Sequence, residues 1–126
     1  MVNYVNTETN TCIFGYGAIH VSVLGCILKF REIKPPVGNG NLLINEDGEK
    51  VGDWDYTGNQ ISILFHTLDE IETICDHIKY IEENKKGSFT FKDITFDFMK
   101  YTEESMNAFK KDIITLKNQM LLCMAC

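Results

Sequence analysis

The sequence predicts an α+β domain in which a mainly antiparallel sheet of about five or six strands is accompanied by two helices, the second closing the chain. Between Thr67 and Gly87, apolar residues recur every three or four positions, which indicates an amphipathic helix. On both sides of that helix apolar residues alternate with polar ones, which is typical of half-buried strands. A second stretch with helical spacing follows Thr102 near the end of the chain.

The helix expected between Thr67 and Gly87 has signals at both ends. Thr67 and Glu70 have the spacing of a capping box, in which each side chain accepts the free backbone N–H of the other residue. Lys85 and Lys86 suit the carboxyl end of a helix, and Gly87 suits the left-handed residue that closes one. The apolar face of this helix consists of Leu68, Ile71, Ile74, Cys75, Ile78 and Ile81.

The segments that flank this helix are predicted to be strands. Between residues 60 and 66, every second side chain is apolar, whereas between residues 88 and 98 the alternation changes phase. A two-residue turn at Lys92 and Asp93 removes that conflict, because it places Phe91 opposite Ile94 and brings all the apolar side chains of the hairpin to one face. That face consists of Phe89, Phe91, Ile94, Phe96 and Phe98.

The first half of the chain is expected to be strands and turns. Its first third is rich in β-branched and aromatic residues, and we interpret it as two strands joined or bulged near Gly25. A helix over residues 18–30 is the alternative. Residues 42–53 are predicted to form a second hairpin, and Gly58 with Asn59 gives a further turn signal.

The closing helix is expected to start after Thr102, a good N-cap residue. Its apolar seam consists of Met106, Phe109, Ile113, Leu116, Met120 and Cys123. The last eight residues, 119–126, are unusually apolar for a chain end. We therefore expect either a homodimer or partner contact through this helix, or simple packing of the helix against its own sheet.

Length and charge narrow the classes of function. At 126 residues the chain is expected to be a single domain, residues 1–126. Its net charge is −6 and its calculated pI is about 5.0. Arg31 is the sole arginine of the sequence, which argues against nucleic-acid binding and against binding to an anionic membrane surface. The acidity is compatible with a basic partner or with ordinary solubility.

The cysteines and the lengths of the apolar runs indicate the cellular compartment of the protein. The five cysteines are odd in number, which suits free thiols in a reducing environment. The first residues lack the features of a signal peptide, and no apolar run has the length of a membrane-spanning helix. We therefore expect a cytoplasmic protein.

An acidic stretch with aromatic residues is the predicted partner-binding site. In such a surface, charges speed the encounter with a basic protein and aromatic side chains supply affinity. The alternative is a solvated hairpin tip in which Trp54 covers the core. The stretch lacks the ligand pattern of an EF-hand calcium loop. The predicted site consists of Glu46, Asp47, Glu49, Asp53, Trp54, Asp55 and Tyr56.

No other motif indicates a reaction. His66, and Cys75 with His77, suggest thiol or metal chemistry, but Cys75 falls on the apolar face of its helix and His77 points elsewhere. The glycine-rich pieces at residues 15–17 and 38–40 do not continue into a nucleotide-binding fingerprint. We predict no catalytic residue, no metal and no cofactor.

Two functions are compatible with these observations. The first is a small acidic protein, not an enzyme, that neutralises a basic toxin, nuclease or defence factor by binding it stoichiometrically, as an immunity protein or phage anti-defence inhibitor does. The second is a small-molecule or nucleotide binder, or a small hydrolase, with its site near His66, Trp54 and Tyr56. No motif is specific enough to name a family.

Overall fold

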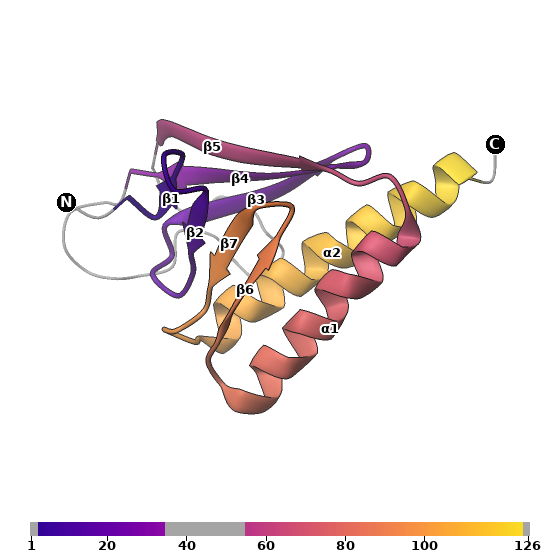
Figure 1. Ribbon diagram of the computed structural model, residues 1–126. Helices are drawn as coiled ribbons and strands as arrows, with labels where there is room; N and C mark the ends of the chain where they lie inside the picture. Colours follow the sequence, from indigo (N-terminus) through magenta and orange to yellow (C-terminus); the bar gives the residue numbers. More distant parts are fainter. Residues whose placement is uncertain (1–2, 35–54, 125–126) are drawn as a thin grey trace.

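The computed structural model describes residues 3–34 and 55–124, and it confirms the α+β class (Figure 1). Its strands are β1 (Val5–Asn6), β2 (Thr11–Ile13), β3 (Ile19–Leu24), β4 (Ile27–Ile33), β5 (Tyr56–Leu64), β6 (Ser88–Phe91) and β7 (Ile94–Asp97). Its helices are α1 (Leu68–Asn84) and α2 (Glu103–Met124). The expected hairpin at residues 42–53 lies outside the described residues.

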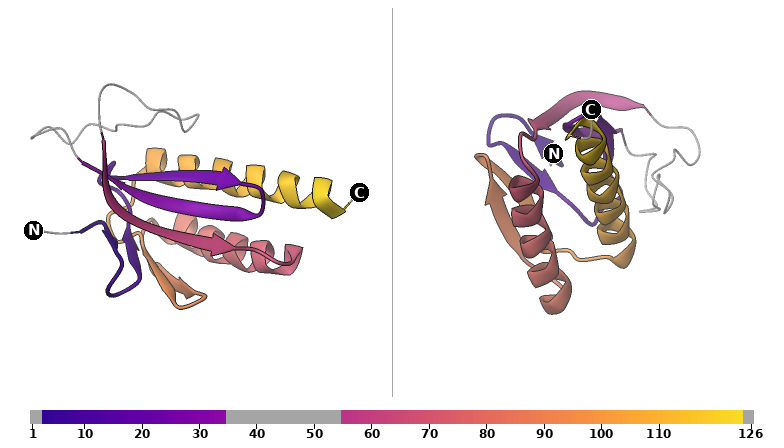
Figure 2. Two further views of the ribbon diagram at one scale, coloured as in Figure 1. Left: turned by 90° about the horizontal axis from the view of Figure 1, so that it is seen from above. Right: turned by 90° about the vertical axis from the view of Figure 1, so that its right-hand side faces the viewer.

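The described strands form two sheets, whereas the sequence predicted one sheet of five or six strands. One sheet has the order β1-β2-β7-β6, and the other has the order β3-β4-β5. All neighbouring strands are antiparallel except β2 and β7, which are parallel. Helix α2 runs along the three-stranded sheet, and α1 lies beside α2 (Figures 1 and 2). The core therefore lies between two sheets and two helices.

Helix α1 begins as predicted and ends earlier than predicted. The Thr67 hydroxyl accepts the Glu70 N–H at 3.4 Å, and the Glu70 carboxylate accepts the Thr67 N–H at 3.0 Å, so the capping box is confirmed. The left-handed residue at the other end is Lys85, with φ 60°, and not Gly87. The Lys85 N–H donates to the Ile81 carbonyl at 2.8 Å, which closes the helix before the chain reaches Gly87.

The predicted hairpin at Lys92 and Asp93 and the predicted join between two strands near Gly25 are both present. Lys92 and Asp93 have φ of 50° and 64°, which is the backbone of a primed turn, and Phe91 pairs with Ile94 as expected. Strands β3 and β4 turn at Gly25, with φ 61°, so the alternative of a helix over this segment is wrong.

A buried carboxylate joins the two sheets. The side chain of Glu32, on β4, is 5% exposed and accepts four hydrogen bonds, so its burial leaves no acceptor without a donor. Two donors are backbone N–H groups of Tyr4 and Val5 near β1, and two are the side chains of Thr57 and Asn59 on β5. The turn expected at residues 58 and 59 is therefore wrong, because these residues continue β5 next to a register shift against β4.

The seam of α2 fills the core up to its last turn. Met106, Phe109, Ile113, Leu116 and Met120 are all buried as predicted. The Phe109 ring packs edge-on against several other phenylalanines, with centroid distances of 5.4 Å to Phe14 and 5.7 Å to Phe98. Cys123, which the spacing placed on the same seam, is exposed in the last turn of α2. No helix of the described residues is long and apolar enough to cross a membrane.

Candidate functional site

The residues that the sequence predicts to bind a partner are only partly described. Asp55 and Tyr56 stand at the start of β5, where Asp55 is exposed and Tyr56 is half-buried. Glu46, Asp47, Glu49, Asp53 and Trp54 lie outside the described residues.

Tyr56 packs against His20 and Arg31. Its hydroxyl lies 2.5 Å from Nδ1 of His20, and the guanidinium carbon of Arg31 lies 4.0 Å from the centre of its ring. The Lys34 N–H donates to the Asp55 carbonyl at 2.6 Å, which ties the end of β4 to the start of β5. Within the described residues, this edge of the sheet therefore combines one exposed carboxylate with basic groups and is not purely acidic.

The groups considered for small-molecule or thiol chemistry do not come together. His66 is exposed just beyond the end of β5, and Tyr56 is its first residue, so the strand separates them by about 30 Å. Cys75 is half-buried against the core, and burial raises the pKa of its thiol. The His77 ring stacks on Phe89 at 4.6 Å. In residues 3–34 and 55–124, no group of three or more His, Cys, Asp or Glu side chains could hold a metal ion.

The outer face of α1 carries a line of acidic side chains around an exposed tyrosine, which we call the acidic stripe. Asp69, Asp76 and Glu83 are spaced seven residues apart, so they fall on one side of the helix along about 21 Å. All three are exposed, and none has an ion pair among the described residues. Tyr80 lies between the last two and is 64% exposed. Thr73 completes the stripe on the same side.

The other acidic residues of α1 face basic groups. Glu82 pairs with Lys110 at 3.0 Å and Glu72 with Lys117 at 3.4 Å, and both pairs join α1 to α2. These partly exposed pairs position the two helices, and each contributes about 0–1 kcal/mol to stability. The carboxylates of the acidic stripe have no such structural task in the described part of the chain.

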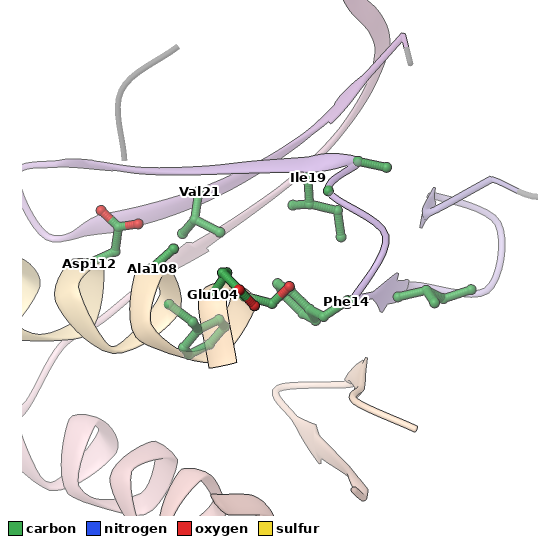
Figure 3. Close-up of a pocket in the computed structure, with 12 residues that line it drawn as sticks. Phe14, Ile19, Val21, Glu104, Ala108 and Asp112 are labelled. Atoms are coloured by element: carbon green, nitrogen blue, oxygen red, sulfur yellow. The ribbon is translucent and has the colours of Figure 1, made fainter. Parts of the chain in front are cut away.

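A cleft lies between α2 and β3, and we call it the α2 cleft (Figure 3). The space within it that is open to water-sized groups is about 40 Å³, and a water molecule needs at least about 10–15 Å³ of such space. The walls include Phe14, Ile19, Val21, Glu104, Ala108 and Asp112.

The loop before β3 shapes one wall of the cleft through a glycine. Gly15 has φ of +102°, and a Cβ atom there would lie 2.0 Å from the carbonyl oxygen of Lys100. Only glycine allows this close approach of two backbones. Phe14 is thereby held flat against Phe98, with ring centres 4.4 Å apart, and forms part of the apolar wall.

Two carboxylates from α2 line the cleft. Glu104 and Asp112 lie on one side of the helix, about 12 Å apart along its axis, with the small side chain of Ala108 between them. Asp112 projects toward β3, where Val21 forms the opposite wall (Figure 3). Burial raises the pKa of Asp112 to about 7, and the nearby Lys111 offsets only part of that effect. No described residue forms a hydrogen bond or ion pair with the carboxylate of Glu104 or Asp112.

Sequence reasoning missed the α2 cleft because its walls are far apart in the chain. A usable signal is the single carboxylate of Asp112 directly before the apolar seam residue Ile113, at a position close to the core. Comparisons with known proteins add no assignment: no family model, no curated protein and no solved structure matches this chain.

Proposed function

We propose that this chain is a stoichiometric binding protein that neutralises a basic protein partner. The observation that carries the proposal is the acidic stripe, in which three unpaired carboxylates and an exposed tyrosine share one face of α1. Carboxylates of this kind attract a basic surface over a distance, and a tyrosine at the centre of an interface supplies contact area at a low cost in side-chain entropy.

Two further features support this proposal. The whole chain has a net charge of −6, so its field attracts cations beyond the stripe itself. Helix α1 is fixed by its capping box and by four buried isoleucines, so the stripe stands on a rigid element and needs little ordering when a partner binds. The predicted docking residues at 46–56 extend the proposal to a second acidic segment, for which Asp53 and Asp55 are the test positions.

The test begins with the capture and identification of the partner. The tagged chain is used to retain proteins from a host extract at low salt, and the retained protein is identified by mass spectrometry and then purified. We expect a basic protein that forms a complex of equal stoichiometry by analytical ultracentrifugation and loses its own activity in that complex. A complex with an acidic protein, or a basic partner whose activity is unchanged when bound, would overturn the proposal.

Charge reversal then locates the contact. Replacing Asp76 and Glu83 by Lys leaves the core face of α1 untouched, and we expect the association rate at low salt to fall about tenfold or more. Glu8→Lys, in an exposed turn, is the control for a charge reversal away from α1, and it changes the net charge by half as much as either double variant. A variant with Asp53 and Asp55 changed to Lys tests the second segment. If neither double variant slows association more than the control does, the proposed docking surfaces are wrong.

Besides the partner-binding surface, exposed apolar residues near the end of α2 support a contact between two copies of the chain. Leu121, Leu122 and Met124 are 44%, 63% and 66% exposed. We propose that this helix end contributes to self-association, as the apolar tail predicts. Sedimentation of the wild-type chain and of a Leu121→Lys variant distinguishes a monomer from a self-associated form. If both proteins are monomers at all concentrations, the proposed self-association is wrong.

A further inference from the structure

The α2 cleft has the features of a binding site, and it is separate from the acidic stripe. Residues 104, 108 and 112 face away from α1, because α2 contacts α1 through Lys110 and Lys117 on its other side. A partner seated on the acidic stripe therefore leaves the cleft open, and the two surfaces can be tested separately.

The chemistry of the cleft selects for cations with an apolar body. Its walls are apolar at Phe14, Ile19 and Val21, and its polar groups include the carboxylates of Glu104 and Asp112. Within the described residues, neither carboxylate has a hydrogen-bond or ion-pair partner; Asp112 is half-buried, whereas Glu104 is exposed at the rim. A buried or half-buried carboxylate costs stability unless a cation or a donor accompanies it.

The spacing of the two carboxylates indicates more than one positive group. They stand about 12 Å apart along the helix axis, and the small side chain of Ala108 leaves a gap between them. The space of about 40 Å³ that is open to water-sized groups admits a slender chain of methylene groups. We infer that the α2 cleft binds an alkyl chain with two ammonium groups, one on Asp112 and one on Glu104, with the methylene groups over Ala108.

This chemistry occurs both in free polyamines and in neighbouring lysine side chains of a peptide. The direct test is a titration of the ¹⁵N-labelled protein followed by the amide resonances of Gly15, Gly17 and Ala18, which belong to the cleft. The probes are putrescine, spermidine, the monoamine butylamine, the neutral butanediol, and a short peptide with two adjacent lysines.

We expect saturable shifts of these resonances with the diamines, with Kd of about 1 mM or tighter, and at least fivefold weaker binding of butylamine. Butanediol should not bind. A peptide that binds more tightly than spermidine identifies lysine side chains as the source of the ligand, and the opposite order identifies free polyamines. Absence of saturable shifts with every amine, or equal shifts with butanediol, would overturn the inference.

Variants assign the roles of the individual residues. Asp112→Asn should weaken putrescine binding about tenfold, and Glu104→Gln should remove the advantage of putrescine over butylamine. Ala108→Leu should block the cleft and abolish binding while both carboxylates remain. Glu8→Gln is the matched control on an exposed carboxylate, and an equal loss in that variant would mean that the amines only screen the protein's charge. Changing Asp76 and Glu83 to Lys should leave amine binding intact, so failure here is distinguishable from failure of the proposed function.

Discussion

Replacing Asp112 by Asn should stabilise the protein, and the gain should depend on pH. The pKa of Asp112 rises from 3.8 to about 7 on folding, because burial disfavours the charged carboxylate. Below pH 3.8 the group is protonated in both the folded and the unfolded chain, so it imposes no cost. Between about pH 4 and pH 7 the Asp112 carboxyl is ionised in the unfolded chain but still protonated in the folded one, so the free energy of unfolding falls as the pH rises. Above pH 7 the full cost is present.

The size of the effect follows from the pKa change. A change of about 3 in pKa corresponds to at most about 4 kcal/mol, at 1.36 kcal/mol for each pKa unit. Asp112 is only half-buried, and solvent screening reduces this figure to about 1–2 kcal/mol. For a chain of this length, Asp112→Asn should raise the melting temperature by about 4 °C for each kcal/mol gained.

The assay is urea denaturation of the wild-type chain and the variant at pH 4 and pH 8. We expect nearly equal free energies of unfolding at pH 4, and a gain of about 1–2 kcal/mol for the variant at pH 8. Glu8→Gln is the control, because an exposed carboxylate stays hydrated in both states. A gain of equal size at both pH values, or no gain at pH 8, would refute the reasoning. A gain in stability combined with lost amine binding would mean that Asp112 is retained for the ligand and not for the fold.

Three other predictions concern the fold. Thr67→Ala removes one half of the capping box and should lower the free energy of unfolding by about 1 kcal/mol in urea denaturation, and an unchanged midpoint would contradict this. Gly15→Ala should lower the free energy of unfolding by more than about 2 kcal/mol, because the new Cβ would meet a backbone oxygen. Gly25→Ala has open space around the new Cβ and should lower it by only about 1 kcal/mol. Burial and the neighbouring Cys123 thiol raise the pKa of Cys26, so the two thiols lie close together, and oxidised glutathione should join them in a disulfide while it is itself reduced to thiols. Peptide mapping by mass spectrometry should find this link with the loss of two hydrogen atoms, and its absence after prolonged oxidation would contradict the contact.

The parts of the fold that local chemistry determines could be predicted from the sequence. The capping box of α1, its buried isoleucine face and the turn at Lys92 and Asp93 all follow from residues within a few positions of one another. The carboxyl end of α1 was placed wrongly because Gly87 is the more favourable left-handed residue, yet Lys85 takes that role in the structure. The Gly87 carbonyl accepts the Phe98 N–H at 2.8 Å, so Gly87 already belongs to the connection with the β6–β7 hairpin.

The features that depend on long-range contacts could not be predicted. Gly58 and Asn59 read locally as a turn, but Asn59 donates to Glu32, a residue far earlier in the chain, and so stays in β5. The α2 cleft depends on the approach of Gly15 to Lys100 and on the packing of Asp112 near β3, and neither contact leaves a periodic pattern in the sequence. The acidic stripe could be read from the helical spacing, but its lack of ion pairs required the positions of Lys110 and Lys117 on α2.

The most direct test of the central claim is the association rate of the purified partner with the wild-type chain, measured by stopped flow over a range of salt concentrations. The account predicts a rate that falls steeply as salt is added, and a rate about tenfold lower at low salt when Asp76 and Glu83 are changed to Lys. The Glu8→Lys control should remain close to the wild type. An association rate that is independent of salt and equal in all three proteins would contradict the claim that the acidic face of α1 binds a basic protein.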